Sequence, residues 1–338
     1  MKTVIDGKHI VLGVCGGIAA YKSVELLRLL VKAGASVRVM MTQNARWFVG
    51  PMTFEALSGH PVCSSLFENN NESAMNHISW AQEADAVVVA PATANIIGKM
   101  AHGIADDALS TFLLAVKSPV IVCPSMNSNM FDHAAVRRNI GILKESGYFV
   151  LEPGSGELAC KTVGPGRLPE PSDILDRLIC SISPKDLTGV RVLVTAGPTR
   201  EFIDPVRFIS NPSSGKMGFA IARAAEHRGG DVVLVTGPSR LPELPNVRTL
   251  RVNTAQEMAE AVFEHLDSCR IVVKTAAVSD YRPAAVYDQK IKKREASWAL
   301  QLERTQDILM EIGRRKQNQF VVGFAAETQD LEKNAVSK

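Results

Sequence analysis

The sequence predicts an α/β protein with two doubly wound, parallel-sheet domains of the Rossmann-like type. Short, continuously apolar runs alternate with amphipathic helical stretches, which is typical of buried parallel strands joined by crossover helices. The chain has 338 residues. At about 100–200 residues per domain, this length predicts two domains. The same alternation starts again at Val190, after a polar segment that contains proline.

The composition is that of an ordinary globular protein, with 46% hydrophobic and 22% charged residues. The net charge of +3 is too small to indicate a nucleic-acid surface. No apolar run approaches the roughly 18 residues of a transmembrane helix, and the N-terminus lacks the apolar core of a secretory signal. The six cysteines include no C-x-x-C pair, which argues against a zinc site and a disulfide framework. We expect a cytoplasmic protein without nucleic-acid or membrane partners.

The first half is expected to alternate strands and helices, and Gly34 and Gly147 favour helix ends. The expected strands are His9–Cys15, Val37–Met41, Ala84–Ala90 (ending in Pro91) and Pro119–Cys123. The expected helices are Ile18–Lys32, Ala105–Val116, Asp132–Glu145 and a closing helix near Ser172–Ser181. Glu152–Pro171 is rich in glycine, proline and polar residues, so it predicts a long loop.

A linker at Ser183–Asp186 separates two expected domains, 1–186 and 187–338. The expected strands of the second domain are Val190–Ala196, Asp231–Thr236, Arg270–Thr275 and Phe320–Phe324. Its expected helices are Gly215–Arg228, Ala255–Leu266 and Thr305–Arg314. The chain stops inside a helical pattern that begins near Gln329, so we expect a sequence that lacks the end of its second domain.

Three loops of the first domain follow predicted strands. Gly16-Gly17 opens a helix, where backbone N–H groups and the helix dipole favour a phosphate, although a plain tight turn has the same signature. Pro91–Asn95 and Pro124–Asn127 also follow strands. Doubly wound sheets bind ligands at the carboxyl ends of their strands, so the three loops predict one cleft.

Three single residues of this domain are candidates for chemistry. His77 has a side chain suited to proton transfer near neutral pH, although a lone histidine is more often structural. Asn127 alone is typical of a turn. Cys160 lies in a glycine-rich polar loop, where the usual role of cysteine as a small buried hydrophobe is less natural.

The second domain contains a glycine–serine turn at Asn211–Gly218 that opens a helix and suits an anion. It is not a P-loop, because Met217 follows Gly215-Lys216 where serine or threonine is required. Asp280 follows an apolar strand, and a basic cluster of Lys290, Lys292 and Lys293 comes shortly after. Taken alone, Asp280 would be interpreted as a turn residue, and the lysine cluster as a solvent-exposed face.

Together, these motifs resemble the bifunctional coenzyme A biosynthesis proteins, in which phosphopantothenoylcysteine decarboxylase is fused to phosphopantothenate–cysteine ligase. The resemblance runs from Lys8 to the last residue. It implies that the first domain is a homo-oligomeric flavoprotein of the cysteine decarboxylase type and that the second depends on CTP. It also implies trimers of the first domain assembled into dodecamers, and dimers of the second.

For the decarboxylase, the resemblance implies FMN with His77 as base, Asn127 binding the substrate carboxylate and Cys160 as proton donor on a flap. Oxidation of the cysteinyl thiol by FMN allows CO₂ to leave, and the reduced flavin and Cys160 then yield 4′-phosphopantetheine. The implied FMN contacts are Gly16, Gly17 and Thr42 at the phosphate, and Ala92, Thr93, Ala94, Asn95 and Ser125 at the ring and ribitol.

For the ligase, the resemblance implies that CTP activates 4′-phosphopantothenate as an acyl cytidylate and that cysteine displaces CMP. Asn211 would act on this intermediate, Lys290 would steady phosphate charge, and Asp280 would hold Mg²⁺. The implied CTP contacts are Lys274, Thr275, Ala276, Asp280, Lys290, Gln306, Asp307, Ile308, Leu309, Phe324 and Lys338.

The chain departs from the family pattern at Cys15, Lys161 and Gln306. Three alternatives stay open: another flavoprotein of the same fold, such as a peptidyl-cysteine decarboxylase or flavin prenyltransferase; a non-enzymatic FMN-binding regulator; and an active decarboxylase with an inactive ligase half. The second domain argues against the first alternative. Retention of the two catalytic candidates His77 and Cys160, together with Asn127, argues against the second.

Overall fold

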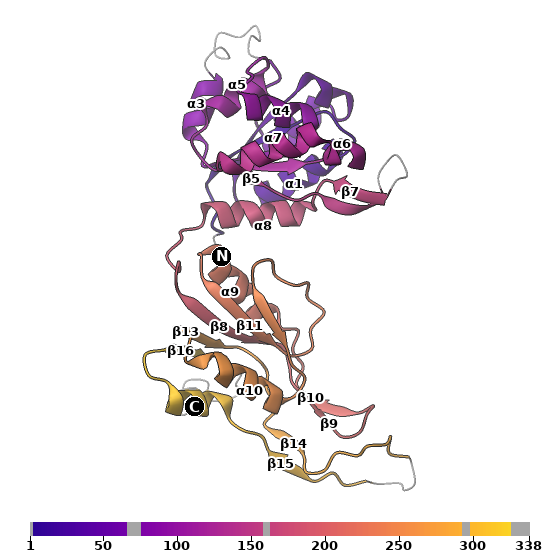
Figure 1. Ribbon diagram of the computed structural model, residues 1–338, viewed down its shortest axis with the longest axis vertical. Coiled ribbons are helices and arrows are strands. Elements are labelled where there is room, and N and C mark those ends of the chain that lie inside the picture. The colour runs from indigo at the N-terminus through magenta and orange to yellow at the C-terminus, as the bar shows by residue number, and fades with distance from the viewer. Residues whose placement is uncertain (1–2, 66–75, 158–162, 293–297, 326–338) are drawn as a thin grey trace. The chain divides into compact units, whose positions relative to one another are not determined.

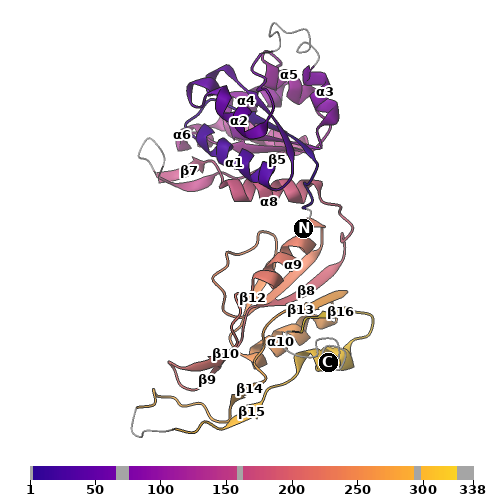
Figure 2. The ribbon, with the colours of Figure 1, turned by 180° about the vertical axis from the view of Figure 1, so that it is seen from behind.

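The computed structural model describes residues 3–65, 76–157, 163–292 and 298–325 (Figures 1 and 2). The chain divides into two compact units, Met1–Ser183 and Pro184–Lys338. Among the helices within these described ranges, none is long and apolar enough to span a bilayer.

Unit 1 contains a five-stranded parallel sheet with the order β2-β1-β3-β4-β5. Its strands are β1 His9–Val14, β2 Ser36–Met41, β3 Ala86–Ala92, β4 Val120–Pro124 and β5 Phe149–Val150. Its helices are α1 Ala20–Lys32, η1 Gln43–Trp47 (a 3₁₀ helix), α2 Pro51–Ser58, α3 Asn76–Glu83, α4 Ala94–His102, α5 Ala108–Ala115, α6 Ser128–Asp132, α7 Ala134–Glu145 and α8 Pro171–Ile182.

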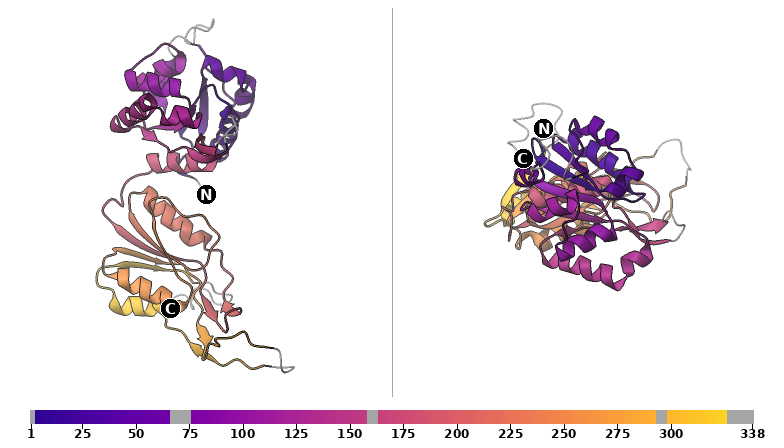
Figure 3. Two further views of the ribbon diagram at one scale, coloured as in Figure 1. Left: turned by 45° about the vertical axis from the view of Figure 1, so that its right-hand side comes forward. Right: turned by 90° about the horizontal axis from the view of Figure 1, so that it is seen from above.

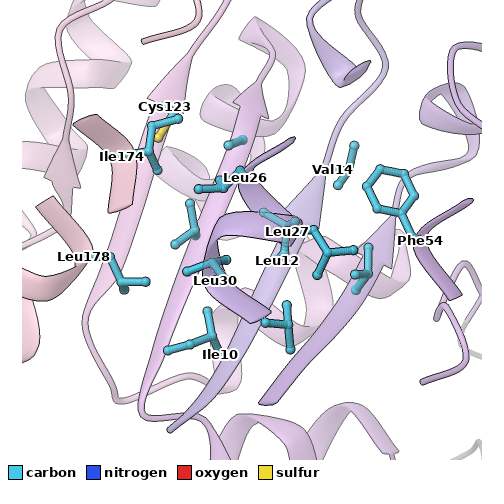
Figure 4. Close-up of a cluster of buried hydrophobic side chains, with 14 of the residues drawn as sticks. Ile10, Leu12, Val14, Leu26, Leu27, Leu30, Phe54, Cys123, Ile174 and Leu178 are labelled. Carbon is cyan, nitrogen blue, oxygen red and sulfur yellow. The ribbon is translucent and has the colours of Figure 1, made fainter. Parts of the chain in front are cut away.

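Each face of this sheet packs against its own set of helices. Alternate residues of β1 point to opposite faces, so Leu12 joins the core under α1, α2 and α8, whereas Val11 joins the core under α4, α5 and α7. Figure 4 shows the first core, where Leu26 and Leu30 of α1 lie over the sheet and Phe54 of α2 lies at the other side of the cluster. Because both faces are covered, the strands are apolar along their whole length.

Unit 2 contains a second five-stranded parallel sheet, with the order β12-β11-β8-β13-β16. Its strands are β8 Arg191–Ala196, β11 Asp231–Thr236, β12 Arg248–Arg251, β13 Ile271–Lys274 and β16 Phe320–Gly323. Helix α9 Lys216–His227 covers one face, and α10 Ala255–Leu266 and α11 Ile308–Arg315 cover the other (Figure 3).

Two short antiparallel hairpins extend unit 2 beyond this sheet. One pairs β9 Arg200–Phe202 with β10 Phe208–Ser210, and the other pairs β14 Tyr281–Pro283 with β15 Leu302–Arg304. Strands β9 and β14 are in contact, and Figures 1 and 2 show the two hairpins side by side.

The strand orders place a topological switch point in each unit. In unit 1 the chain runs from β1 to β2 on one side and returns to β3 on the other, so the switch lies between β1 and β3. In unit 2 it lies between β8 and β13. Ligands of open α/β sheets bind beyond the carboxyl ends of strands at such points.

The doubly wound fold class is confirmed, and three local expectations are wrong. Glu152–Pro171 is not a loop throughout, because β6 Gly154–Glu157 and β7 Val163–Arg167 form an antiparallel hairpin. Strand β3 continues through Pro91 to Ala92, with an irregular register after Val89. The expected helix from Asp132 is two helices, since His133 is extended and caps α7 with its side chain.

Candidate functional site

A cleft of about 480 Å³ lies at the switch point of unit 1. It is lined by the loops that follow β1, β3 and β4, by the first turn of α1 and by β7. A second cleft of about 390 Å³ shares Gly16, Thr93, Ala94 and Met130 with it and adds Thr42 and Asn95. These volumes fit a cofactor, because ligand pockets usually measure about 300–1,000 Å³.

The two adjacent glycines of the first loop have different surroundings. A Cβ added to Gly16 would lie 2.5 Å from the Cβ of Asn44 and 2.7 Å from its carbonyl carbon, so the backbones approach too closely for a side chain. A Cβ added to Gly17 would meet no protein atom within 4 Å. Gly17 therefore presents bare backbone to open space in the cleft.

The N-terminus of α1 suits an anion. Its N-cap residue is Ala19, which has no side chain that could accept from the first turn, whereas α4 is capped by Thr93. Ala20 N and Lys22 N donate to backbone carbonyls of the same turn, but no side chain competes with a ligand here, and the positive end of the helix dipole favours a phosphate. The glycine turn, the cleft volume and this helix end together fit a phosphorylated cofactor.

Two cationic side chains lie at the same cleft, and the motifs of the sequence assign neither of them to the site. Lys22 is 8% exposed, and its Nζ donates to Glu170 Oε1 at 2.8 Å, which ties α1 to the start of α8. Arg167 of β7 lines the cleft from the hairpin. A lysine at helical spacing and an arginine in a glycine-rich segment carry no sequence signal that marks them as cleft residues.

Asn127 and Ser125 follow β4, and β7 packs against their segment. Asn127 caps α6, and its Oδ1 accepts from Asn129 N at 2.9 Å. Met126 N donates to Gly166 O at 3.0 Å, and Ser128 Oγ donates to Pro165 O at 2.7 Å. The β6–β7 hairpin is thereby fastened to the loop that carries Asn127.

His77 lies in the first turn of α3, which packs against α5. Cys160 and Lys161 fall between β6 and β7, outside the described residues. Cys15 is buried, and this burial raises the pKa of its thiol to about 12 despite hydrogen bonding with Thr93. Its sulfur belongs to the core under α4 and α5.

An ion-pair cluster forms one wall of the second cleft. Lys99 Nζ lies 2.6 Å from Asp106 Oδ1 and 2.7 Å from Asp107 Oδ2. Burial lowers the pKa of Lys99, but hydrogen bonds with both carboxylates outweigh it and leave the pKa raised. Asp107 also caps α5 through a capping box with Ser110, so the cluster fixes α4 against α5.

In unit 2, side chains from β8 and its loop hold the loop that follows β13. Thr195 Oγ1 accepts from Thr275 N at 3.2 Å and from Ala276 N at 3.1 Å. Thr199 Oγ1 accepts from Ser279 N at 3.0 Å. These bonds span the switch point, so they fix the backbone of the loop that follows β13 beside β8.

Most of the other candidate residues of unit 2 gather at the same edge. Asn211 Nδ2 donates to Val278 O at 3.0 Å, Thr305 N donates to Asp280 O at 2.9 Å, and Phe324 N donates to Lys274 O at 3.1 Å. Asp280 is exposed, and no cluster of three or more potential metal ligands occurs within the described ranges.

The four expected CTP contacts at the start of α11 differ in burial and in role. Asp307 caps the helix by accepting from Met310 N at 2.9 Å, and Ile308 is 1% exposed, so its side chain belongs to the core. Gln306 is exposed and Leu309 is half-buried. Lys290 is exposed in the connection between β14 and β15, and Lys338 lies outside the described residues.

A doubly wound sheet with a cofactor-sized, glycine-lined cleft at its switch point defines a nucleotide- or flavin-binding α/β protein. The family model "Flavoprotein" matches residues 1–183, and the model "DNA/pantothenate metabolism flavoprotein C-terminal domain" matches residues 187–338. The first unit is therefore a flavoprotein unit.

The "Coenzyme A biosynthesis bifunctional protein CoaBC" of Bacillus subtilis is 48% identical over 338 residues, covering 99% of this chain and 83% of that protein. The protein of the same name from Escherichia coli is 46% identical over 339 residues, covering 99% and 84%. A crystal structure of the C-terminal domain of such a protein matches with 49% identity and a TM-score of 0.41, over 46% of this chain and 74% of that chain.

The chain belongs to the family of bifunctional coenzyme A biosynthesis proteins. This membership confirms the expectation of an enzyme with a decarboxylase and a ligase activity.

Proposed function

We propose that residues 1–186 decarboxylate phosphopantothenoylcysteine and that residues 187–338 form that compound from 4′-phosphopantothenate, cysteine and CTP. The observation that carries the proposal is the cleft at the switch point of unit 1, where three strand-end loops, an uncapped helix end and the bare backbone of Gly17 meet.

The cofactor is FMN. Gly16, Gly17 and Thr42 would hold its phosphate, with the N-terminus of α1 supplying the positive dipole. The ring and ribitol would lie against the five residues Ala92, Thr93, Ala94, Asn95 and Ser125. Bound there, FMN would supply the two-electron redox chemistry that the decarboxylation of a cysteinyl substrate requires.

The side chains bind the substrate and move its protons. Asn127 would donate to the substrate carboxylate without adding a positive charge that would hold back CO₂ loss. His77 would act as the base, because imidazole titrates near neutral pH. Cys160 would return a proton to the product, and the packing of β7 on the Asn127 loop supports its delivery from the β6–β7 hairpin.

In unit 2, CTP would lie at the edge formed by Lys274–Ala276, Asp280, Gln306–Leu309, Phe324 and Lys338. The loop after β13 supports this position, because hydrogen bonds to the hydroxyls of Thr195 and Thr199 hold its backbone in place. Mg²⁺ would be bound by Asp280 together with the CTP phosphates, since Mg²⁺ often takes only one or two protein carboxylates.

Lys290 and Asn211 would act during the two chemical steps of the ligase. Lys290 would stabilise the negative charge that develops as pyrophosphate leaves. Asn211 would act on the acyl cytidylate, and its bond to Val278 O places it at the CTP edge.

We also propose a homo-oligomer, with unit 1 in trimers that assemble into dodecamers and unit 2 in dimers. Trp47 is 87% exposed and Met52 is 74% exposed, and Phe48 between them is also exposed. An exposed apolar patch of this kind supports an interface.

The test is a coupled assay on the purified chain. One mixture contains 4′-phosphopantothenate, cysteine, CTP and Mg²⁺, and a parallel mixture contains preformed phosphopantothenoylcysteine. CO₂ from both is expected. CO₂ from the second mixture alone would contradict the ligase proposal, and no CO₂ from flavin-loaded protein would contradict the decarboxylase proposal and favour a regulatory relative.

A further inference from the structure

The turn of the β9–β10 hairpin contains a buried carboxylate that none of the roles above uses. Asp204 is 0% exposed, although the turn joins two short strands at the surface. Its Oδ1 accepts from Val206 N and Arg207 N, both at 2.8 Å, which closes the turn. A buried carboxylate is costly unless it is fully hydrogen-bonded, so its place here needs an explanation.

The second oxygen of Asp204 binds a segment far away in the sequence. Oδ2 accepts from Ile291 N at 3.1 Å and from Arg207 Nη1 at 2.8 Å. Arg207 Nη1 also donates to Ile291 O at 3.1 Å. The carboxylate and the guanidinium thus hold both backbone polar groups of Ile291.

A third bond extends the attachment. Tyr287 N donates to Ile203 O at 2.9 Å, so the segment 287–291 is bound to the turn at both ends. Lys290 lies within this segment and its side chain is exposed. The same hairpin leads directly into Asn211, since β10 ends at Ser210. One hairpin therefore carries Asn211 and anchors the segment that carries Lys290.

The charge state of Asp204 suits this arrangement. Burial raises the pKa of its carboxyl group, but hydrogen bonds from the backbone of Val206, Ile291 and Arg207, with the Arg207 charge, outweigh burial and hold the pKa below its ordinary value. The group is therefore ionised at neutral pH, and ionised acceptors form the stronger hydrogen bonds.

We propose that Asp204 is a positioning residue of the ligase: its carboxylate binds the 287–291 segment to the β9–β10 hairpin so that Lys290 and Asn211 act on the same substrate. The proposal rests on the ligase function proposed above and deepens it. Asp204 itself touches no substrate and acts through Lys290.

The test uses Asp204→Asn in the full chain, because this isosteric change keeps one acceptor oxygen for the turn and replaces the other with an NH₂ donor. Hydrogen exchange read by mass spectrometry on peptides that contain Ile291 is expected to quicken by about tenfold or more, as for a lost hydrogen bond to a charged group. Peptides from β8 should keep their protection, which shows that unit 2 is folded.

Pyrophosphate release is expected to fall by about 100-fold, the size of effect that a small misplacement of a catalytic group produces. CO₂ release from preformed phosphopantothenoylcysteine should be unchanged. In a Lys290→Ala background, Asp204→Asn should change the ligation rate by less than about twofold, because coupled residues are not additive. A purely structural role would give additive losses.

The matched control is Asp231→Asn, which removes an exposed ion pair with Arg191 in the same unit and should leave exchange at Ile291 and both rates unchanged. If Asp204→Asn unfolds unit 2, Arg207→Lys takes its place, since it keeps Asp204 but disturbs the link to Ile291 O. Unchanged exchange, or faster exchange with normal ligation, would overturn the proposal. A wild type that releases no pyrophosphate would contradict the ligase function instead, and the exchange result would still test the anchor.

Discussion

At the scale of single residues, the flavoprotein unit places chemically similar side chains in very different environments. Gly16 and Gly17 are neighbours, but only Gly16 is pressed against another backbone. Cys15 and Cys63 are both cysteines, but Cys15 is buried whereas Cys63 is half-buried. Substitutions at this scale can therefore separate packing from ligand binding.

Gly16→Ala and Gly17→Ala form such a pair. The Gly16 change should destabilise unit 1 by about 1–3 kcal/mol, the usual cost of overpacking, because its Cβ would collide with Asn44. The Gly17 change should leave the stability of the flavin-free protein unchanged but weaken FMN binding, because its methyl group would enter ligand space. Denaturant unfolding and flavin titration measure the two effects. A Gly17→Ala protein that binds FMN normally would contradict the proposed phosphate site.

Thiol reactivity tests the burial of Cys15. Because burial raises its pKa to about 12, the thiol stays protonated at pH values well below this, and the protonated form does not react with alkylating agents. Iodoacetamide at mildly alkaline pH is expected to spare Cys15 and the equally buried Cys123 until the chain is denatured. Mass spectrometry of the modified peptides reads the result, with half-buried Cys63 as the comparison. Labelling of Cys15 in the folded protein would disprove the buried position.

The Asp107 carboxylate gives unit 1 a dependence on acid pH. Burial raises the pKa of Asp107, but Lys99 and the capping bonds from Ser110 outweigh it, so the pKa is lowered in the folded state. A lowered pKa contributes stability above the unfolded value of about 3.9, and this contribution is lost as pH falls through the folded value.

Asp107→Asn keeps a good N-cap but removes the charge. It should lower the free energy of unfolding at neutral pH by about 1 kcal/mol, as expected for a partly buried charged hydrogen bond. The difference should vanish below the folded pKa, where the wild-type carboxyl is also neutral. Urea unfolding at a series of pH values provides the measurement. A difference that is constant with pH would show that the charge does not contribute.

At the scale of elements, the sequence was enough to predict a strand or helix wherever burial imposed an apolar pattern on it. The apolar strands β1, β8 and β11 and the amphipathic helices α9 and α10 were predicted close to their observed bounds. The β6–β7 hairpin was missed because its residues are mostly glycine, proline and polar. What fixes it is packing against the segment after β4, and no local pattern encodes that contact.

Gly166 tests that contact. Its φ of +134° and a carbonyl contact with Met126 leave no space for a Cβ, so Gly166→Ala should displace β7 from the Asn127 loop. The decarboxylation rate is expected to fall by about 100-fold, as for a misplaced catalytic group, while the flavin stays bound. The control in the same hairpin is Gly154→Ala, whose Cβ would meet its nearest atoms at 3.8 Å, an ordinary contact. Equal rates for the two variants would contradict a positioning role for β7.

At the scale of the whole molecule, each compact unit contains two core clusters of its own and a complete parallel sheet. Met1–Ser183 expressed alone is therefore expected to fold, bind FMN and release CO₂ from phosphopantothenoylcysteine. Circular dichroism and a flavin spectrum check folding and loading. An unfolded fragment would show that the boundary at Ser183 is misplaced.

The candidate sites were predictable where they coincide with strand ends. Gly16, Thr93 and Ser125 follow predicted strands, so the switch-point rule is enough to bring them together in one cleft. Lys22 reaches its cleft from within a helix, and Asp204 reaches Ile291 across 87 residues. Contacts of that kind depend on tertiary packing, and the residue types alone do not reveal them.

The hairpins that carry Asn211 and flank Lys290 interrupt connections of unit 2, one between β8 and α9 and the other between β13 and α11. Neither adds a strand to the five-stranded sheet. Insertions and deletions in these two connections would therefore leave the five-stranded sheet and its covering helices intact. A descendant lineage could reposition Asn211 and Lys290 by remodelling these two surface hairpins, without having to evolve a new core.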